Sequence, residues 1–116
     1  MTVPAANDWP TPLYGHWYAV ARADRLARKP LPVTLLGRHL VLARDRQGIV
    51  YALEDRCPHR QVALSAGCLR EGQLQCPYHG WRFDASGQLS ALPGQDPSRP
   101  LPRIRVPAFP VQEHDG

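Results

Sequence analysis

The sequence has few cysteines and no long apolar stretch, and each shortage excludes a class of protein. Only three cysteines occur among 116 residues, an odd number that argues against a disulfide scaffold. No run reaches the ~18 apolar residues that a membrane-spanning helix needs. Residues 1–12 have neither the basic start nor the apolar centre of a signal peptide. We therefore expect a cytoplasmic protein that makes no use of a membrane.

Lysine is also scarce, so arginine carries almost all of the positive charge. The formal net charge is +4 at pH 7, and Lys29 is the only lysine. A basic face could attract an acidic protein partner, or the arginines could form a dispersed, solvated surface. The arginines are scattered and no nucleic-acid-binding motif accompanies them, so we expect no nucleic-acid partner.

Turn-forming residues are abundant and predict a chain of short elements. The sequence contains 13 prolines and 9 glycines, which disfavour long helices. Residues 1–12 should form a loose N-terminal segment, and Asp24 can cap a helical turn that runs through Arg28. Turn signals at 45–48 and 84–87 predict two hairpins.

Segments rich in apolar, aromatic or β-branched residues are expected to be strands. They are 15–21, 33–36, 39–44, 49–54, 73–75, 81–84, 88–91, 103–106 and 108–112. Residues around Ser65 and Gly67 should instead form an irregular connection. Short strands at near-even spacing, with turns between them, indicate an all-β fold, either a sandwich or a small barrel.

Two short motifs bring together residues that can hold a metal. Cys57 and His59 form a Cys-x-His pair, and Cys76 and His79 form a Cys-x-x-His pair. In this mixed order they match the ligands of a Rieske 2Fe–2S cluster, in which two thiolates hold one iron and two imidazoles hold the other. Structural zinc also uses two cysteines and two histidines, and the spacing alone leaves zinc open as an alternative. Cys68 is left over and is expected to be a small loop residue.

Residues next to the four ligands suit a rigid pair of ligand loops, over about 56–67 and 75–84. Pro58 and Pro77 each follow a ligand cysteine, and proline stiffens a loop by fixing φ. Gly80 allows a close backbone approach or a positive φ. Arg60 and Arg82 flank the loops. They can screen the negative charge added on reduction or contact an acidic partner protein, or they can simply donate hydrogen bonds to backbone carbonyls.

The motifs and their surroundings resemble the Rieske domain of ring-hydroxylating oxygenases. The segments that carry the resemblance are Cys57–Arg60, Leu64–Gly67, Cys76–Asp84 and His16–Ala21. The best match is the N-terminal part of the oxygenase α-type component, as in vanillate demethylase-like and phenylpropionate dioxygenase-like enzymes. The resemblance covers about 13–112, which implies a Rieske-type antiparallel fold with a cluster-binding subdomain, and leaves 113–116 as a tail.

The resemblance implies one-electron transfer. In that family the domain takes electrons from a reductase or ferredoxin and passes them to a mononuclear non-haem iron held by two histidines and a carboxylate. The remaining histidines His16, His39 and His114 form no such set, so the chain alone should not oxygenate a substrate. It is expected to be the domain through which electrons enter an oxygenase, with a free-standing Rieske-type ferredoxin as the alternative.

Residues beyond the ligands bear on the redox potential. High-potential Rieske proteins place hydroxyl donors at the positions that correspond to Trp81 and Phe83, and neither side chain has a hydroxyl. We therefore expect a potential at the low end of the Rieske range, about −150 mV. Tyr78, Gly80 and Trp81 belong to a motif that favours an oxygenase domain over a free-standing ferredoxin, because free carriers usually lack that tryptophan.

Overall fold

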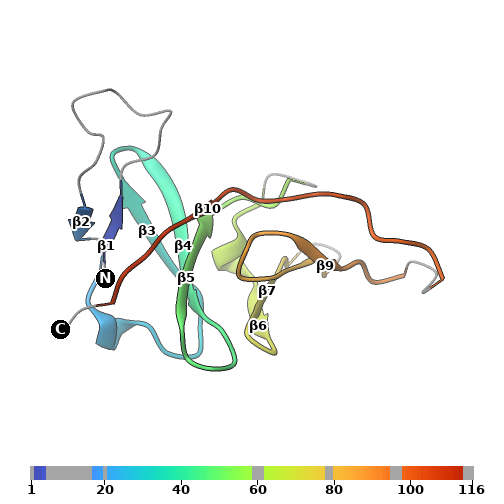
Figure 1. The fold of residues 1–116 in the computed structure, drawn as a ribbon, viewed down its shortest axis with the longest axis horizontal. Coiled ribbons are helices and arrows are strands. Elements are labelled where there is room, and N and C mark those ends of the chain that lie inside the picture. Colours follow the sequence, from blue (N-terminus) through green and yellow to red (C-terminus); the bar gives the residue numbers. More distant parts are fainter. Residues whose placement is uncertain are drawn as a thin grey trace.

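The computed structural model describes residues 2–4, 17–19, 21–58, 62–77, 80–94 and 98–113. This part consists of short strands and two single-turn 3-10 helices, η2 (Ala23–Arg25) and η3 (Leu64–Ala66). The strands form two four-stranded antiparallel sheets and one two-stranded sheet (Figure 1). The prediction of an all-β fold is therefore confirmed. In the described ranges no helix has the length and apolar character needed to cross a membrane.

The first four-stranded sheet has the order β10-β5-β4-β3. Its strands are β3 (Leu31–Leu35), β4 (Arg38–Arg44), β5 (Val50–Glu54) and β10 (Ala108–Phe109). The predicted hairpin between β4 and β5 turns on Asp45, whose carboxylate accepts the backbone N–H groups of Gln47 and Ile49 at 2.9 Å each. An aspartate at this position stabilises a turn because its side chain takes up backbone donors that the tight bend leaves unpaired.

The second four-stranded sheet has the order β6-β7-β8-β9 and carries one of the two ligand motifs. Its strands are β6 (Cys68–Arg70), β7 (Gln73–Gln75), β8 (Arg82–Phe83) and β9 (Leu89–Ala91). Asp84 organises the β8–β9 turn as Asp45 does in the first sheet, since its carboxylate accepts the N–H groups of Ser86 at 2.9 Å and Gln88 at 3.1 Å. Both predicted hairpin turns are thus present.

The core lies between the two four-stranded sheets. Strands β4 and β5 send alternate side chains to opposite faces, because side chains in a strand alternate with a period of two. One face contributes Val41, Ala43, Tyr51 and Leu53 to a cluster with residues of the second sheet. The other face packs against Leu26 and Phe109. Burial on both faces explains why β4 and β5 are continuous apolar runs in the sequence.

Several local predictions were wrong. The expected loose segment 1–12 contains β1 (Thr2–Pro4), which pairs with β2 (Trp17–Ala19), and Val3 is fully buried. The expected irregular connection after Ser65 includes η3 and β6. The N-cap of η2 is Arg22, with no side-chain cap, so Asp24 does not begin this turn.

A long connection follows β9. Figure 1 shows it reaching the far end of the molecule and returning to β10 beside β5. The strand expected over 103–106 is reduced to an isolated bridge between Gln88 and Arg105. The backbone nevertheless pairs there, since Leu89 donates to Ile104 at 2.9 Å and Val106 donates to Gly87 at 2.7 Å.

Candidate metal centre

Each predicted ligand loop is closed by one backbone hydrogen bond of the same kind. The N–H of Cys57 donates to the carbonyl of Val62 at 2.7 Å, and the N–H of Cys76 donates to the carbonyl of Trp81 at 2.7 Å. In both loops the donor is the cysteine and the acceptor lies five residues later. The two motifs therefore form two loops of matching size, each anchored at its cysteine.

The two motif cysteines lie in the apolar core. Cys57 is 0% exposed and Cys76 is 2% exposed, and both belong to the cluster between the two sheets. Neither forms a disulfide, whereas Cys68 is free and exposed on β6. Two buried thiols without a disulfide, on neighbouring loops, are a fitting donor set for the thiolate-bound iron of a 2Fe–2S cluster.

The two histidines of the motifs, His59 and His79, lie outside the described residues, as do Arg60 and Tyr78. Among the residues that the structure describes, no group of three or more metal-binding side chains gathers. The structure therefore places the cysteine half of the predicted ligand set, and the histidine half stays a prediction. His39, which was expected to be a packing or surface residue, is exposed on β4.

A carboxylate fixes both ends of the first ligand loop. Asp55, two residues before Cys57, accepts the backbone N–H of Ser65 at 2.7 Å and the Ser65 hydroxyl at 2.6 Å. This pair joins the end of β5 to η3 across the loop. Hydrogen bonds to a charged acceptor are roughly twice as strong as those between neutral groups, so the pair restrains the loop. This role of Asp55 was not predicted from the sequence, because no local motif links the two residues.

The two loops touch through their backbones at Gly67. A Cβ atom added at Gly67 would overlap the carbonyl oxygen of Gln75 and lie 3.1 Å from Cδ of Pro77. Only glycine fits this approach without displacing the backbone next to Cys76. Gly67 lies in one of the segments that carry the family resemblance, but no sequence pattern indicated why a glycine is needed there.

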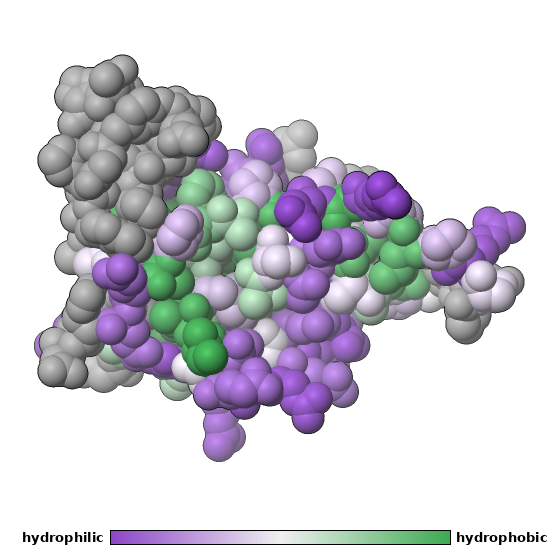
Figure 2. Space-filling view, in the orientation of Figure 1, coloured by the Kyte–Doolittle hydropathy of each residue, from purple (hydrophilic) through white to green (hydrophobic). Residues whose placement is uncertain are grey.

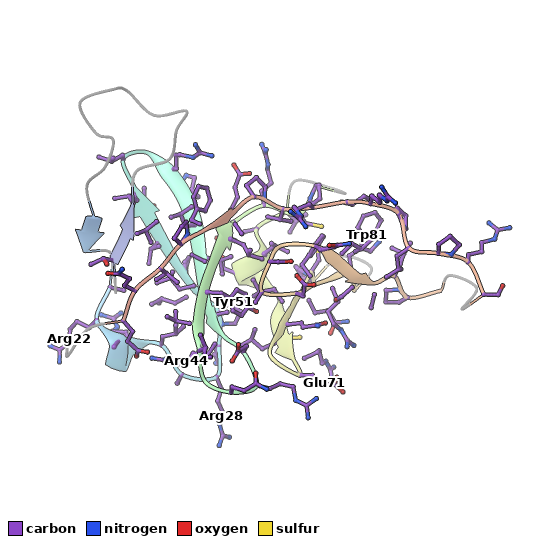
Figure 3. All side chains as sticks on the ribbon, viewed as in Figure 1. Arg22, Arg28, Arg44, Tyr51, Glu71 and Trp81 are labelled. Atoms are coloured by element: carbon purple, nitrogen blue, oxygen red, sulfur yellow. The ribbon has the colours of Figure 1, made fainter. Side chains whose placement is uncertain are left out.

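Gly80 has the backbone conformation that its position predicted. Its φ is +70°, and a Cβ atom there would lie 2.8 Å from Nε2 of Gln75. Both suggested reasons for glycine, a close approach and a positive φ, apply. The next residue, Trp81, is partly buried against the core cluster that contains Cys57 and Cys76, and Figure 3 shows its place beside the second sheet.

Arg82 follows directly and lies on β8. Its Nε is buried and is one of two such side-chain atoms in the described ranges without a hydrogen-bond partner. Arg82 thus directly follows Trp81, whose carbonyl closes the second loop.

Tyr51 ties the first sheet to the hairpin that leads into the second loop. Its hydroxyl donates to the carbonyl of Gly72 at 2.7 Å. Burial, together with the negative charges of Asp45 and Asp84, raises the pKa of Tyr51 well above its ordinary value. The phenol therefore stays protonated and keeps donating throughout the ordinary pH range. Figure 3 shows Tyr51 on β5, at the centre of the molecule.

Comparison with known proteins agrees with this geometry. The sequence profile described as "Rieske [2Fe-2S] domain" matches residues 16–110. The chain is 46% identical over 100 residues to the oxygenase component of dicamba O-demethylase from Stenotrophomonas maltophilia, a match that covers 86% of this chain and 29% of that protein. It is 42% identical to 4beta-methylsterol monooxygenase of Methylococcus capsulatus, with 87% of this chain and 28% of that protein covered.

Solved structures give the same result. The crystal structure of apo dicamba monooxygenase superposes with a TM-score of 0.78 at 45% identity, covering 85% of this chain and 30% of that chain. NdmA of Pseudomonas putida CBB5 superposes with a TM-score of 0.77 at 35% identity, covering 84% and 31%. This chain thus spans about a third or less of the length of the proteins it matches. It belongs to the Rieske [2Fe-2S] domain family, matches the N-terminal part of Rieske non-haem iron oxygenase α subunits, and has a Rieske-type 2Fe–2S cluster as its cofactor.

Proposed function

We propose that this chain transfers single electrons as the domain through which electrons enter a ring-hydroxylating or demethylating oxygenase. The observation that carries the proposal is the pair of buried thiols, Cys57 and Cys76, on two loops closed in the same way. Its relatives include a demethylase and monooxygenases by name. The substrate would bind in a catalytic domain outside these 116 residues.

The proposed ligands are Cys57 and Cys76 for one iron and His59 and His79 for the other. When bound, the cluster supplies a one-electron redox couple. The chain's own residues exclude water from the thiolates and hold the loops, since both cysteines are buried and Asp55 anchors the first loop. Such restraint favours electron transfer because the ligands rearrange little between the two redox states.

The partners proposed are a reductase or ferredoxin as donor and a mononuclear non-haem iron domain or subunit as acceptor. An acidic donor is supported by a basic edge of the domain. Arg28, Lys29 and Arg46 are exposed there and make no ion pair within the described part of the chain. Figure 2 shows mostly hydrophilic residues along this lower edge, from which Arg28 projects in Figure 3.

Carboxylates beside this edge offset only part of its positive charge. Asp45 is engaged in its turn, and Glu113 pairs with Arg44 at 2.6 Å. A hollow of about 380 Å³ lies between Arg28, Arg46 and Gly72. Surface charge of one sign steers an oppositely charged partner and makes association depend on salt.

The predicted cytoplasmic location stays a prediction, because some relatives, such as pheophorbide a oxygenase of rice, are chloroplastic by name.

The test is the EPR spectrum of the dithionite-reduced protein, purified without oxygen, together with its iron, sulfide and zinc content. A rhombic signal with an average g value below 2 and about two irons per chain would support the proposal. An EPR-silent protein with one zinc per chain would overturn it in favour of a structural metal site. Electron transfer to a separately supplied oxygenase would favour the free ferredoxin instead.

A further inference from the structure

Gln75 lies where the two ligand loops meet. Its carbonyl oxygen occupies the space that a side chain at Gly67 would need, at the end of the first loop. Its side-chain amide Nε2 donates to the carbonyl of Gly80 at 3.4 Å, at the end of the second loop. Gln75 also directly precedes Cys76 in the sequence. One residue therefore contacts both loops, through its main chain and its side chain respectively.

The orientation of the Gln75 amide follows from its other neighbour. Nε of Arg70 donates to Oε1 of Gln75 at 3.1 Å, and a guanidinium can only donate. The amide oxygen must therefore face Arg70, which leaves the NH₂ group facing the carbonyl of Gly80. Arg70 and Gln75 lie on the paired strands β6 and β7, so the donor to Gly80 is held in place by the sheet itself.

The end of the second loop is also confined sterically. A Cβ atom on Gly80 would lie 2.8 Å from Nε2 of Gln75 and 3.2 Å from Cγ of Pro93. The backbone of Gly80 is thus packed between these two side chains. Because Gly80 directly follows His79 in the sequence, restraint of the Gly80 peptide also restrains the main chain that carries the imidazole.

We propose that Gln75 is a positioning residue for the cluster. It fixes the His79 end of the second ligand loop by donating to the Gly80 carbonyl, and it holds that loop against Gly67 of the first. This inference deepens the proposed function and depends on it, because the loop has to be held in place only if it carries a ligand. Groups that orient metal ligands from outside the ligand set affect metal retention and electronic properties.

The experiment uses Gln75→Ala and Gln75→Glu in the full chain, with Gln73→Ala as the matched control. Gln73 is a glutamine on the same strand, two residues earlier, and its Oε1 accepts the Ser90 hydroxyl at 2.7 Å. A glutamate at position 75 can still accept from Arg70, but it cannot donate to Gly80 while ionised. Its size is nearly unchanged, so it remains informative where the alanine variant fails to fold.

Two readouts are measured on the purified protein: the rate of cluster bleaching with an iron chelator, and the EPR spectrum after reduction. We expect Gln75→Ala and Gln75→Glu to bleach about fivefold faster than wild type, the ratio that RT converts to ~0.9 kcal/mol, as for one lost hydrogen bond. Their g values should shift or broaden, and Gln73→Ala should match wild type in both readouts.

Equal bleaching rates and unchanged EPR spectra in Gln75→Glu and Gln73→Ala would overturn the assignment of Gln75. A change in thermal stability with an unchanged EPR spectrum would also overturn it, because it would show a purely structural role. A wild-type protein without a 2Fe–2S signal would instead overturn the proposed function, so the two failures are distinguishable.

Discussion

The backbone N–H of Cys76 donates to the carbonyl oxygen of Trp81 at 2.7 Å, and the same bond, with the same spacing, joins Cys57 to Val62. Each bond converts a Cys-Pro segment into a short closed loop. Because His59 and His79 fall inside these loops in the sequence, each proposed imidazole ligand belongs to a chain segment fixed at both ends. The matching closure gives a physical reason why two motifs of different spacing can serve one centre.

Replacing Gly67 should cost more than replacing a glycine that has open space around its Cβ position, such as Gly94. Gly67→Ala forces a methyl group into the carbonyl of Gln75, and overpacking of this kind destabilises by about 1–3 kcal/mol. The strain falls on the residue before Cys76, so the variant should also retain less iron. Chemical denaturation and iron content of the purified protein measure the two effects.

Gly94→Ala is the matched control for Gly67→Ala. Gly94 has a φ of +85° but open space around its Cβ position. Alanine there should lower the free energy of unfolding only through backbone strain, by about 1–2 kcal/mol. Its iron content should equal that of wild type. Full iron content in Gly67→Ala would contradict the close approach of the two loops.

The bond between Asp55 and Ser65 should contribute measurably to stability. Asp55→Ala removes both acceptors from Ser65, which should cost about 1.5–3 kcal/mol for hydrogen bonds to a charged group. Ser65→Ala removes only the hydroxyl and should cost less. A double-mutant cycle with urea denaturation gives the coupling, and purely additive effects would contradict a direct interaction.

Much of the site was predictable because its signals are local. The strand over 73–75 has the predicted bounds, and the two hairpin turns were marked by their own Asp and Gly residues. Over 103–106, where a strand was expected, burial alternates, since Ile104 and Val106 are more buried than Arg103 and Arg105. That segment makes only one bridge, because pairing length depends on a partner elsewhere in the chain, which local alternation does not reveal.

The elements that were missed depend on contacts distant in the sequence. Strand β1 is only three residues long, and Val3 is buried against Leu35 and Leu40. Strand β6 is equally short and is defined by its pairing with β7. The contacts of Gln75 could not be predicted either, since they join β6, β7 and both loops. Short strands have weak propensity signals, so tertiary pairing decides them.

Acid should destabilise the local structure around Gln112 and Glu113. Arg44 donates to Glu113, and this hydrogen bond lowers the pKa of Glu113 below its ordinary value. A carboxyl group with a depressed pKa stabilises the fold above its unfolded-state pKa, and that contribution is lost as pH falls through the folded-state pKa. Hydrogen exchange near Gln112 should therefore accelerate below about pH 4.3.

Glu113→Gln is the control for this acid effect. The amide keeps the shape of the side chain but does not titrate, so exchange near Gln112 should lose this part of its pH dependence. Because Glu113 is exposed, its ion pair with Arg44 should also weaken in high salt. An identical pH profile in Glu113→Gln and wild type would contradict a role for this pair.

Substitution of the three cysteines should have different effects on the cluster. Cys57→Ser and Cys76→Ser should each abolish the visible absorption of the cluster, because each removes a proposed thiolate ligand. Cys68→Ser should keep it, since Cys68 is exposed and lies outside the core cluster. Iron and acid-labile sulfide content measure the result. A full cluster in Cys76→Ser would contradict the proposed ligand set.

The reduction potential should lie near the low end of the Rieske range, about −150 mV rather than +300 mV. Hydrogen bonds to the cluster sulfurs stabilise the reduced form and raise the potential. Phe83 is fully buried in the cluster of core residues that contains both proposed ligand cysteines, and Trp81 packs against the same cluster. Neither side chain offers a hydroxyl to a sulfur atom. A redox titration followed by visible circular dichroism gives the value. A potential above about +100 mV would mean that other donors compensate, and it would remove the argument from these two positions.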